Sequence, residues 1–196
     1  LLLDTSNSMD GLIDQAKAQL WQIVNELSYA KCNEKSPNLK IALYEYGNDR
    51  LNAQEGYVKQ VLPFSNDLDE ISKQLFALTT NGGNEYCGKV IQTSLNQLQW
   101  GQQDEDLNLI FIAGNEPFTQ GPIHYQEAIA AAKKKGISVN TIFAGNYNDG
   151  VNGSWKSGAL IADGSYMSID ANQRVVHIEA PQDKEIAELN AKLNQT

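Results

Sequence analysis

A short segment near the start of the chain, DTSNS at residues 4–8, places a carboxylate and two hydroxyls at alternate positions: Asp4, Ser6 and Ser8. It follows the apolar run at residues 1–3 and precedes a long amphipathic stretch. In a turn between a buried strand and a helix, these oxygens project into one small space. Hard oxygen ligands of this kind favour Mg²⁺, Mn²⁺ or Ca²⁺ over general acid–base chemistry.

Two further polar loops carry oxygen ligands. The segment TTNGGNE ends in Asn84 and Glu85, and the segment GNEP contains Glu116. We expect Glu85, Asn84 or Glu116 to complete the metal shell begun by DTSNS, directly or through the waters that Mg²⁺ commonly keeps. In the alternative without a metal, the serines of DTSNS cap the following helix, Glu85 lies at a helix N-terminus and Glu116 is a solvated turn residue.

Alternating strand and helix patterns extend along nearly the whole chain and position these loops. Apolar or alternating runs predict strands, and apolar residues at helical spacing predict helices. Strands are expected at residues 1–3, 39–46, 57–64, 107–113, 137–144, 164–169 and 174–178. Helices are expected at residues 12–31, after 67, after 85, at 123–135, at 155–162 and from about 183, with a Gly/Asn-rich loop at 145–153.

This order of elements predicts an α/β fold with a doubly wound, mostly parallel central sheet and helices on both faces. In such folds ligands gather beyond the carboxyl ends of the strands, so the three oxygen-rich loops should lie together. The chain begins inside an apolar strand. We therefore expect residues 1–196 to form a single domain that is excised from a longer chain and lacks the start of its first strand.

The composition narrows the possible classes of function. The chain has 196 residues, of which 41% are hydrophobic and 20% charged, which is typical of a soluble globular protein. Its net charge of -9 argues against general binding to nucleic acid or to an anionic membrane. It contains no apolar run of about 18 residues, so no membrane insertion is expected. Cys32 and Cys87 should lie at opposite ends of the sheet, as free thiols.

The DTSNS segment matches the DxSxS motif of the von Willebrand factor type A domain family, and the order of elements resembles that family along essentially the whole chain. The resemblance implies an antiparallel edge strand at residues 57–64. It also implies a metal-ion-dependent adhesion site, where DxSxS supplies three oxygens, a second loop a threonine and a third loop an aspartate. The function implied is a non-enzymatic module that binds a protein partner at this loop face, in a secreted or cell-envelope protein.

Two positions depart from the family pattern. Asn84 stands where the family usually has the threonine, and Gly114 stands where it usually has the aspartate. We therefore expect a rebuilt site that uses the neighbouring Glu85 and Glu116. Added carboxylates make such a site less positive, which weakens the capture of an acidic group on the partner.

Two alternatives remain open at this point. The first keeps the fold without the metal, as an interaction scaffold within a larger assembly. The second is an enzyme that resembles the haloacid dehalogenase phosphatases, with Asp4 as the nucleophile after a buried first strand. Those enzymes carry a second carboxylate two residues further on, where this chain has Ser6.

Overall fold

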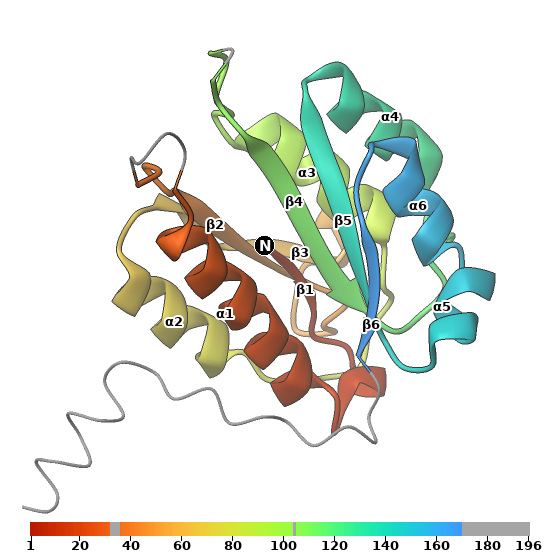
Figure 1. Cartoon of the computed structure of the whole chain (residues 1–196). Helices are drawn as coiled ribbons and strands as arrows, with labels where there is room; N and C mark the ends of the chain where they lie inside the picture. Colours follow the sequence, from red (N-terminus) through yellow and green to blue (C-terminus); the bar gives the residue numbers. More distant parts are fainter. Residues whose placement is uncertain (32–35, 104, 170–196) are drawn as a thin grey trace, which may run out of the picture.

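The centre of the molecule is a sheet that has, within the described residues, six strands in the order β3-β2-β1-β4-β5-β6 (Figure 1). The computed structural model describes residues 1–31, 36–103 and 105–169. Its strands are β1 (Leu2–Asp4), β2 (Ile41–Tyr46), β3 (Val58–Ser65), β4 (Asn108–Gly114), β5 (Ile137–Ala144) and β6 (Tyr166–Ile169). Neighbouring strands pair in parallel except β2 and β3, which are antiparallel. The predicted mostly parallel sheet and its antiparallel edge strand are confirmed.

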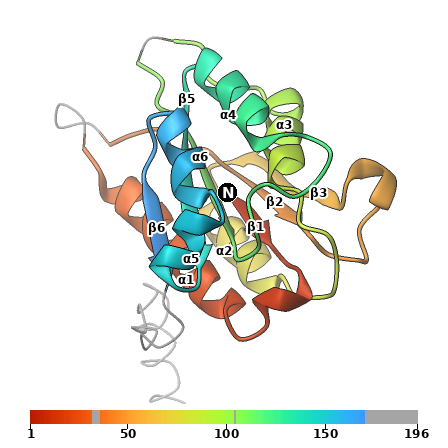
Figure 2. The ribbon, with the colours of Figure 1, turned by 90° about the vertical axis from the view of Figure 1, so that its right-hand side faces the viewer.

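Helices cover both faces of this sheet (Figures 1 and 2). They are α1 (Ile13–Tyr29), α2 (Leu68–Ala77), α3 (Cys87–Gln97), α4 (Tyr125–Lys134), α5 (Tyr147–Asn152) and α6 (Trp155–Ile161), with short 3-10 helices η1 (Asn7–Met9) and η2 (Ala53–Glu55). Helices α1 and α2 pack on one face, whereas α3, α4 and α6 pack on the other. None of the helices in the described ranges is long and apolar enough to cross a membrane.

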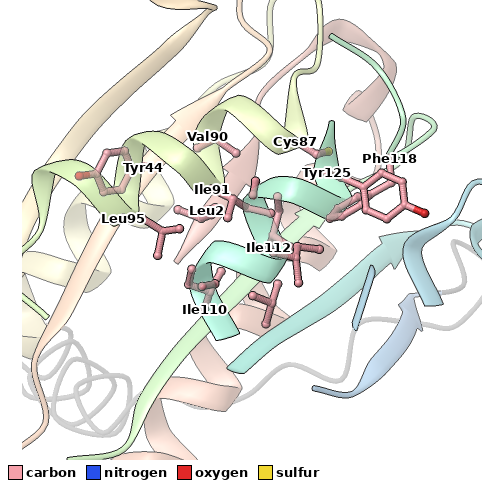
Figure 3. Packing of buried hydrophobic residues seen from close by; sticks show 14 of the residues in the cluster. Leu2, Tyr44, Cys87, Val90, Ile91, Leu95, Ile110, Ile112, Phe118 and Tyr125 are labelled. Atoms are coloured by element: carbon pink, nitrogen blue, oxygen red, sulfur yellow. The ribbon is translucent and has the colours of Figure 1, made fainter. Parts of the chain in front are cut away.

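Alternate residues of the central strands belong to two different hydrophobic cores, one on each face of the sheet. In β1, Leu2 belongs to the core under α3 and α4, while Leu3 belongs to the core under α1. Figure 3 shows the first core, where Ile110 and Ile112 of β4 pack near Ile91 of α3. Because both of its faces are buried, the sheet holds its strand ends in fixed positions, and these ends carry the candidate site.

Local sequence signals account for several element ends. The side chain of Asp67 accepts a hydrogen bond from the Glu70 backbone N–H at 3.0 Å and begins α2, as its spacing predicts. After α4, Gly136 adopts a left-handed φ of 70°, which ends the helix. The predicted helix at residues 12–31 is shorter, Ile13–Tyr29.

One prediction is wrong, since the expected loop at residues 145–153 contains the helix α5. The Asn146 side chain accepts a hydrogen bond from the Asn148 N–H at 2.9 Å and caps this helix. Cys87 is buried and free, as expected. The predicted strand at 174–178, the final helix from about 183 and Cys32 lie outside the described residues.

Candidate functional site

Three loops meet beyond the carboxyl ends of β1 and β4, and we call the surface they form the loop face. It consists of residues 4–9, 79–86 and 114–117. The Asn81 N–H donates to the Thr5 carbonyl at 3.0 Å and joins the second loop to the first. The three oxygen-rich segments therefore lie together, as predicted: the first and third follow the neighbouring strands β1 and β4, and the second, which follows α2, is hydrogen-bonded to the first.

The carboxylate of Asp4, at the end of β1, lies at the centre of the loop face and is 0% exposed. Its Oδ1 accepts a hydrogen bond from the Ser6 N–H at 2.8 Å. Its Oδ2 is buried and has no hydrogen-bond partner among the described residues. An unpartnered, buried carboxylate oxygen is unfavourable, so this atom has an unused capacity to accept a positive ligand or a proton.

Burial raises the pKa of Asp4 from 3.8 to about 7. The negative charge of Glu85 adds to this increase, whereas hydrogen bonding from Ser6 and the nearby backbone of Asn115 lower the pKa. The carboxylate is therefore ionised only at a considerable free-energy penalty when no cation is bound.

The two serines of DTSNS lie beside this carboxylate and link it to the third loop. The hydroxyls of Ser6 and Ser8 lie 2.9 Å apart. The Ser8 hydroxyl donates to Asn115 Oδ1 at 2.8 Å, and Asn115 Nδ2 donates back to the Ser8 carbonyl at 2.8 Å. Asn115, which sequence reasoning missed as a site residue, thus fixes the first loop against the third.

The serines do not cap a helix. Ser6 precedes η1, but its hydroxyl accepts no hydrogen bond from the N–H groups of that helix, and the residue that precedes α1 is Leu12. The capping alternative considered from the sequence is therefore wrong for these hydroxyls. They remain available as oxygen ligands next to Asp4.

Glu85 enters the site from the second loop and is 7% exposed. A Cβ atom placed on Gly47 would lie 2.8 Å from Asp4 Oδ1, 3.0 Å from Glu85 Cγ and 3.4 Å from Ser6 Cβ. The side chains of Asp4, Glu85 and Ser6 thus converge on the space above a glycine, which also has a left-handed φ of 79°. A residue with a side chain at this position would displace them.

Burial also raises the pKa of Glu85, and the negative charges of Glu116 and Asp49 add to the effect. The hydroxyl of Ser6 opposes it by hydrogen bonding. The loop face therefore contains several carboxylates that repel one another electrostatically.

The remaining two predicted site residues lie further out. Asn84 is exposed. Glu116 is half-buried, and its Oε2 accepts a hydrogen bond from Gln120 Nε2 at 3.3 Å. Its backbone carbonyl accepts from Trp155 Nε1 at 2.8 Å, so packing of α6 fixes the third loop. The structure places Glu116 close enough to act on Glu85 through its charge, while Asn84 lies outside the hydrogen-bonded network of the serines.

At Gly114 the structure leaves no room for a side chain. A Cβ atom there would lie 2.6 Å from the Tyr46 hydroxyl and 3.0 Å from both Cβ and Oδ2 of Asp4. Tyr46 is fully buried, and its hydroxyl donates to the Ala113 carbonyl at 3.1 Å. Because this tyrosine cannot move away cheaply, the space of the missing third-loop side chain is already filled.

The donor chemistry around Asp4 fits a hard divalent cation that keeps several waters. Within the described ranges, no three His, Cys, Asp or Glu side chains are grouped closely enough to hold a metal by themselves. A cation would therefore depend chiefly on Asp4 and the two serine hydroxyls, with Glu85 or water filling other positions. The unpartnered Oδ2 of Asp4 supports this assignment of donors.

Comparison with known proteins identifies this arrangement of strands and loops. The family model of the von Willebrand factor type A domain matches residues 1–154. No curated protein sequence matches the chain.

Solved structures with the same fold come from distant relatives. The protein BatB from Bacteroides thetaiotaomicron is 18% identical with a TM-score of 0.65, over 100% of this chain and 97% of that one. The SpRpn10 VWA domain is 16% identical with a TM-score of 0.61, over 89% of this chain and 88% of that one. Proximal thread matrix protein 1 from the mussel byssus is 9% identical with a TM-score of 0.60, over 96% of this chain and 44% of that one. That structure is described with a zinc-occupied MIDAS motif.

Proposed function

Because the chain belongs to the von Willebrand factor type A domain family, we propose that it is a non-enzymatic module that binds a protein partner through the loop face. Domains of this family commonly act in protein interaction. The loop face suits this role because its three loops are joined to one another by hydrogen bonds and anchored to a sheet that is buried on both faces.

The proposed module uses a divalent cation, Mg²⁺, Mn²⁺ or Ca²⁺, held by Asp4, Ser6 and Ser8. The observation that carries this proposal is the unpartnered Oδ2 of Asp4 in a fully buried position. When bound, the cation would supply the positive charge that this carboxylate lacks. Glu85 would complete the shell from the second loop, and Glu116 or Asn84 would act through water.

A thermal unfolding experiment tests the metal. Millimolar Mg²⁺ or Mn²⁺ should raise the melting temperature of the wild-type protein above its value in a chelator, since a ligand that binds only the folded state stabilises it by about 2.7 kcal/mol at 100 times its Kd. Asp4→Asn should abolish the increase. The matched control is Glu26→Gln, which neutralises an exposed carboxylate on α1. An unchanged melting temperature of the wild-type protein would favour the metal-free scaffold.

We assign no catalytic residue to the chain. In the alternative of a phosphatase, the residue two positions after Asp4 would have to act as an acid and base, but this residue is Ser6 and its N–H is engaged with Asp4. The protein should therefore fail to hydrolyse p-nitrophenyl phosphate in the presence of Mg²⁺. Hydrolysis that Asp4→Ala abolishes would overturn the non-enzymatic assignment.

We further propose that the domain belongs to a secreted or cell-envelope protein. A similar fold occurs in a thread matrix protein of the mussel byssus, which supports this location. Immunoblots of fractionated source cells should find the protein with envelope or extracellular markers, and recovery with cytoplasmic markers alone would contradict the proposal.

A further inference from the structure

Within the described residues, the loop face and its margin carry carboxylates that form no ion pair. Ion pairs between described residues occupy the acidic side chains of Asp14, Glu45, Glu70 and Asp163, all of which lie elsewhere. The carboxylates of the loop face and its margin are in none of these pairs. They belong to Asp4, Asp49, Glu85, Glu116 and Asp149.

Asp4 gives an independent reason to expect a positive ligand at this cluster. It is 0% exposed, and its Oδ2 has no hydrogen-bond partner in the described part of the chain. A divalent cation at Asp4 would be balanced by the charges of Asp4 and Glu85. The other three carboxylates would then leave the surroundings negative, so an acidic group of a partner is repelled and a basic group is attracted.

A cleft of about 390 Å³ lies beside Asn115, the residue that links the first and third loops. Its lining residues include the apolar Pro117 and Phe143 and the exposed, acidic Asp149. An aliphatic stem with a positive head fits such a lining, because Lys and Arg bury their methylene groups against apolar surface while the charge meets an acidic group. The cleft is completed by Thr119, Asn152, Gly153 and Ser154.

Among the described residues, neither Lys156 nor Arg50 forms an ion pair with these carboxylates, although both lie close to one of them in the sequence. Lys156 Nζ donates to the Tyr147 hydroxyl at 3.0 Å and lies 5.5 Å from the centre of that ring. Arg50 is exposed beside Asp49, but among the described residues it forms no ion pair.

We propose that the loop face recognises a basic peptide segment of its partner, with one Lys or Arg side chain in the cleft between Asn115 and Asp149. This inference rests on the proposed binding function and names the chemistry of the partner. Glu116, at the edge of the cleft, and Asp49, on the second loop's side, attract the neighbouring basic residues of the segment.

Fluorescence anisotropy with labelled octalysine and octaglutamate peptides, in Mg²⁺ at physiological salt, tests the inference. Wild-type protein should bind octalysine and not octaglutamate. Because the chain has a net charge of -9, a control for general attraction is essential. The loop variant is Asp49→Asn, Glu116→Gln and Asp149→Asn, and the control removes three exposed carboxylates elsewhere, Glu26→Gln, Glu105→Gln and Glu127→Gln.

The loop variant should weaken octalysine binding roughly tenfold, since three partly exposed pairs together amount to about one factor of ten. The control should bind nearly as the wild-type protein does. A single variant, Thr119→Lys, places a positive charge on an exposed position of the cleft and should also weaken binding. Unchanged melting temperatures would show that these variants fold.

Three results would overturn the inference: equal weakening in the loop and control variants, no binding of octalysine, or binding of octaglutamate that requires Mg²⁺. The thermal shift with Mg²⁺ separates this failure from failure of the proposed metal site. If Mg²⁺ stabilises the wild-type protein and not Asp4→Asn while octalysine fails to bind, the metal-dependent module stands and the basic partner is wrong.

Discussion

Replacing Asp4 with Asn should make the metal-free protein more stable at alkaline pH. The amide keeps an oxygen to accept the hydrogen bond that the Ser6 N–H donates to Oδ1 at 2.8 Å. It removes a negative charge from a fully buried position. The substitution therefore separates the electrostatic penalty at this position from its hydrogen bonding.

The size of the effect follows from the pKa of Asp4, which burial raises from 3.8 to about 7. Below pH 3.8 the carboxyl is protonated in both the folded and the unfolded chain, and there is no penalty. As the pH rises from 3.8 to about 7, the unfolded chain releases the proton first, so stability falls. Since a tenfold change in proton affinity is worth about 1.4 kcal/mol, the full loss is about 4 kcal/mol.

Thermal unfolding in a chelator between pH 4 and pH 8 measures the difference between wild type and Asp4→Asn. The two proteins should have similar stabilities near pH 4. At pH 8 the melting temperature of the variant should be higher than that of the wild type by up to about 10 °C for a chain of this size. Added Mg²⁺ at pH 8 should reduce the difference by stabilising the wild-type protein alone. A difference in melting temperature that does not change with pH would refute the argument that ionisation of the buried Asp4 carboxyl destabilises the protein.

Three further substitutions test the surroundings of the site. Gly114→Asp should destabilise the protein by about 1–3 kcal/mol in urea unfolding, because its Cβ meets the Tyr46 hydroxyl. The added change Tyr46→Phe should recover part of the loss, and equal stabilities of the single variant and the wild type would contradict the packing argument. Glu85→Gln removes a negative charge that raises the pKa of Asp4, so the pH midpoint of the stability loss should move to lower pH. A shift of this midpoint to higher pH would be inconsistent with the coupling. Lys17→Met should cost about 1–3 kcal/mol, since the buried Lys17 ammonium donates at 2.6 Å to the carbonyl that follows α2; an unchanged urea midpoint would show that this carbonyl finds another donor.

Most of the fold could be predicted because the hydrophobic periodicity agrees with the final burial. The run that forms β4 is apolar on both sides, and its residues do enter both cores, as Ile112 and Ala113 show. Helix α5 escaped prediction because its sequence is rich in Asn and Gly. A Cβ atom on Gly150 would lie 2.7 Å from Phe143 Cγ, so the glycine permits close packing that local propensity does not reveal.

The site could be predicted only in part. The spacing of DTSNS and its place after a strand indicated Asp4 and both serines. Asn115 was missed because its pairing with Ser8 joins residues 107 positions apart in the chain. No local pattern marks such a contact, and the role of a tyrosine in β2 at the third loop is equally invisible from spacing.

Tyr46 gives a physical reason for the unusual arrangement of acidic residues at this site. Its buried hydroxyl fills the space beside Gly114, where the family usually has an aspartate. A second carboxylate nevertheless reaches the centre of the loop face, from Glu85 on the second loop. The central charge therefore matches the family pattern while its direction of approach differs. An aspartate at Gly114 alone would add a third negative charge to a space without room for it. To obtain the usual arrangement of the family, Tyr46, Gly114 and Glu85 would therefore have to be changed together.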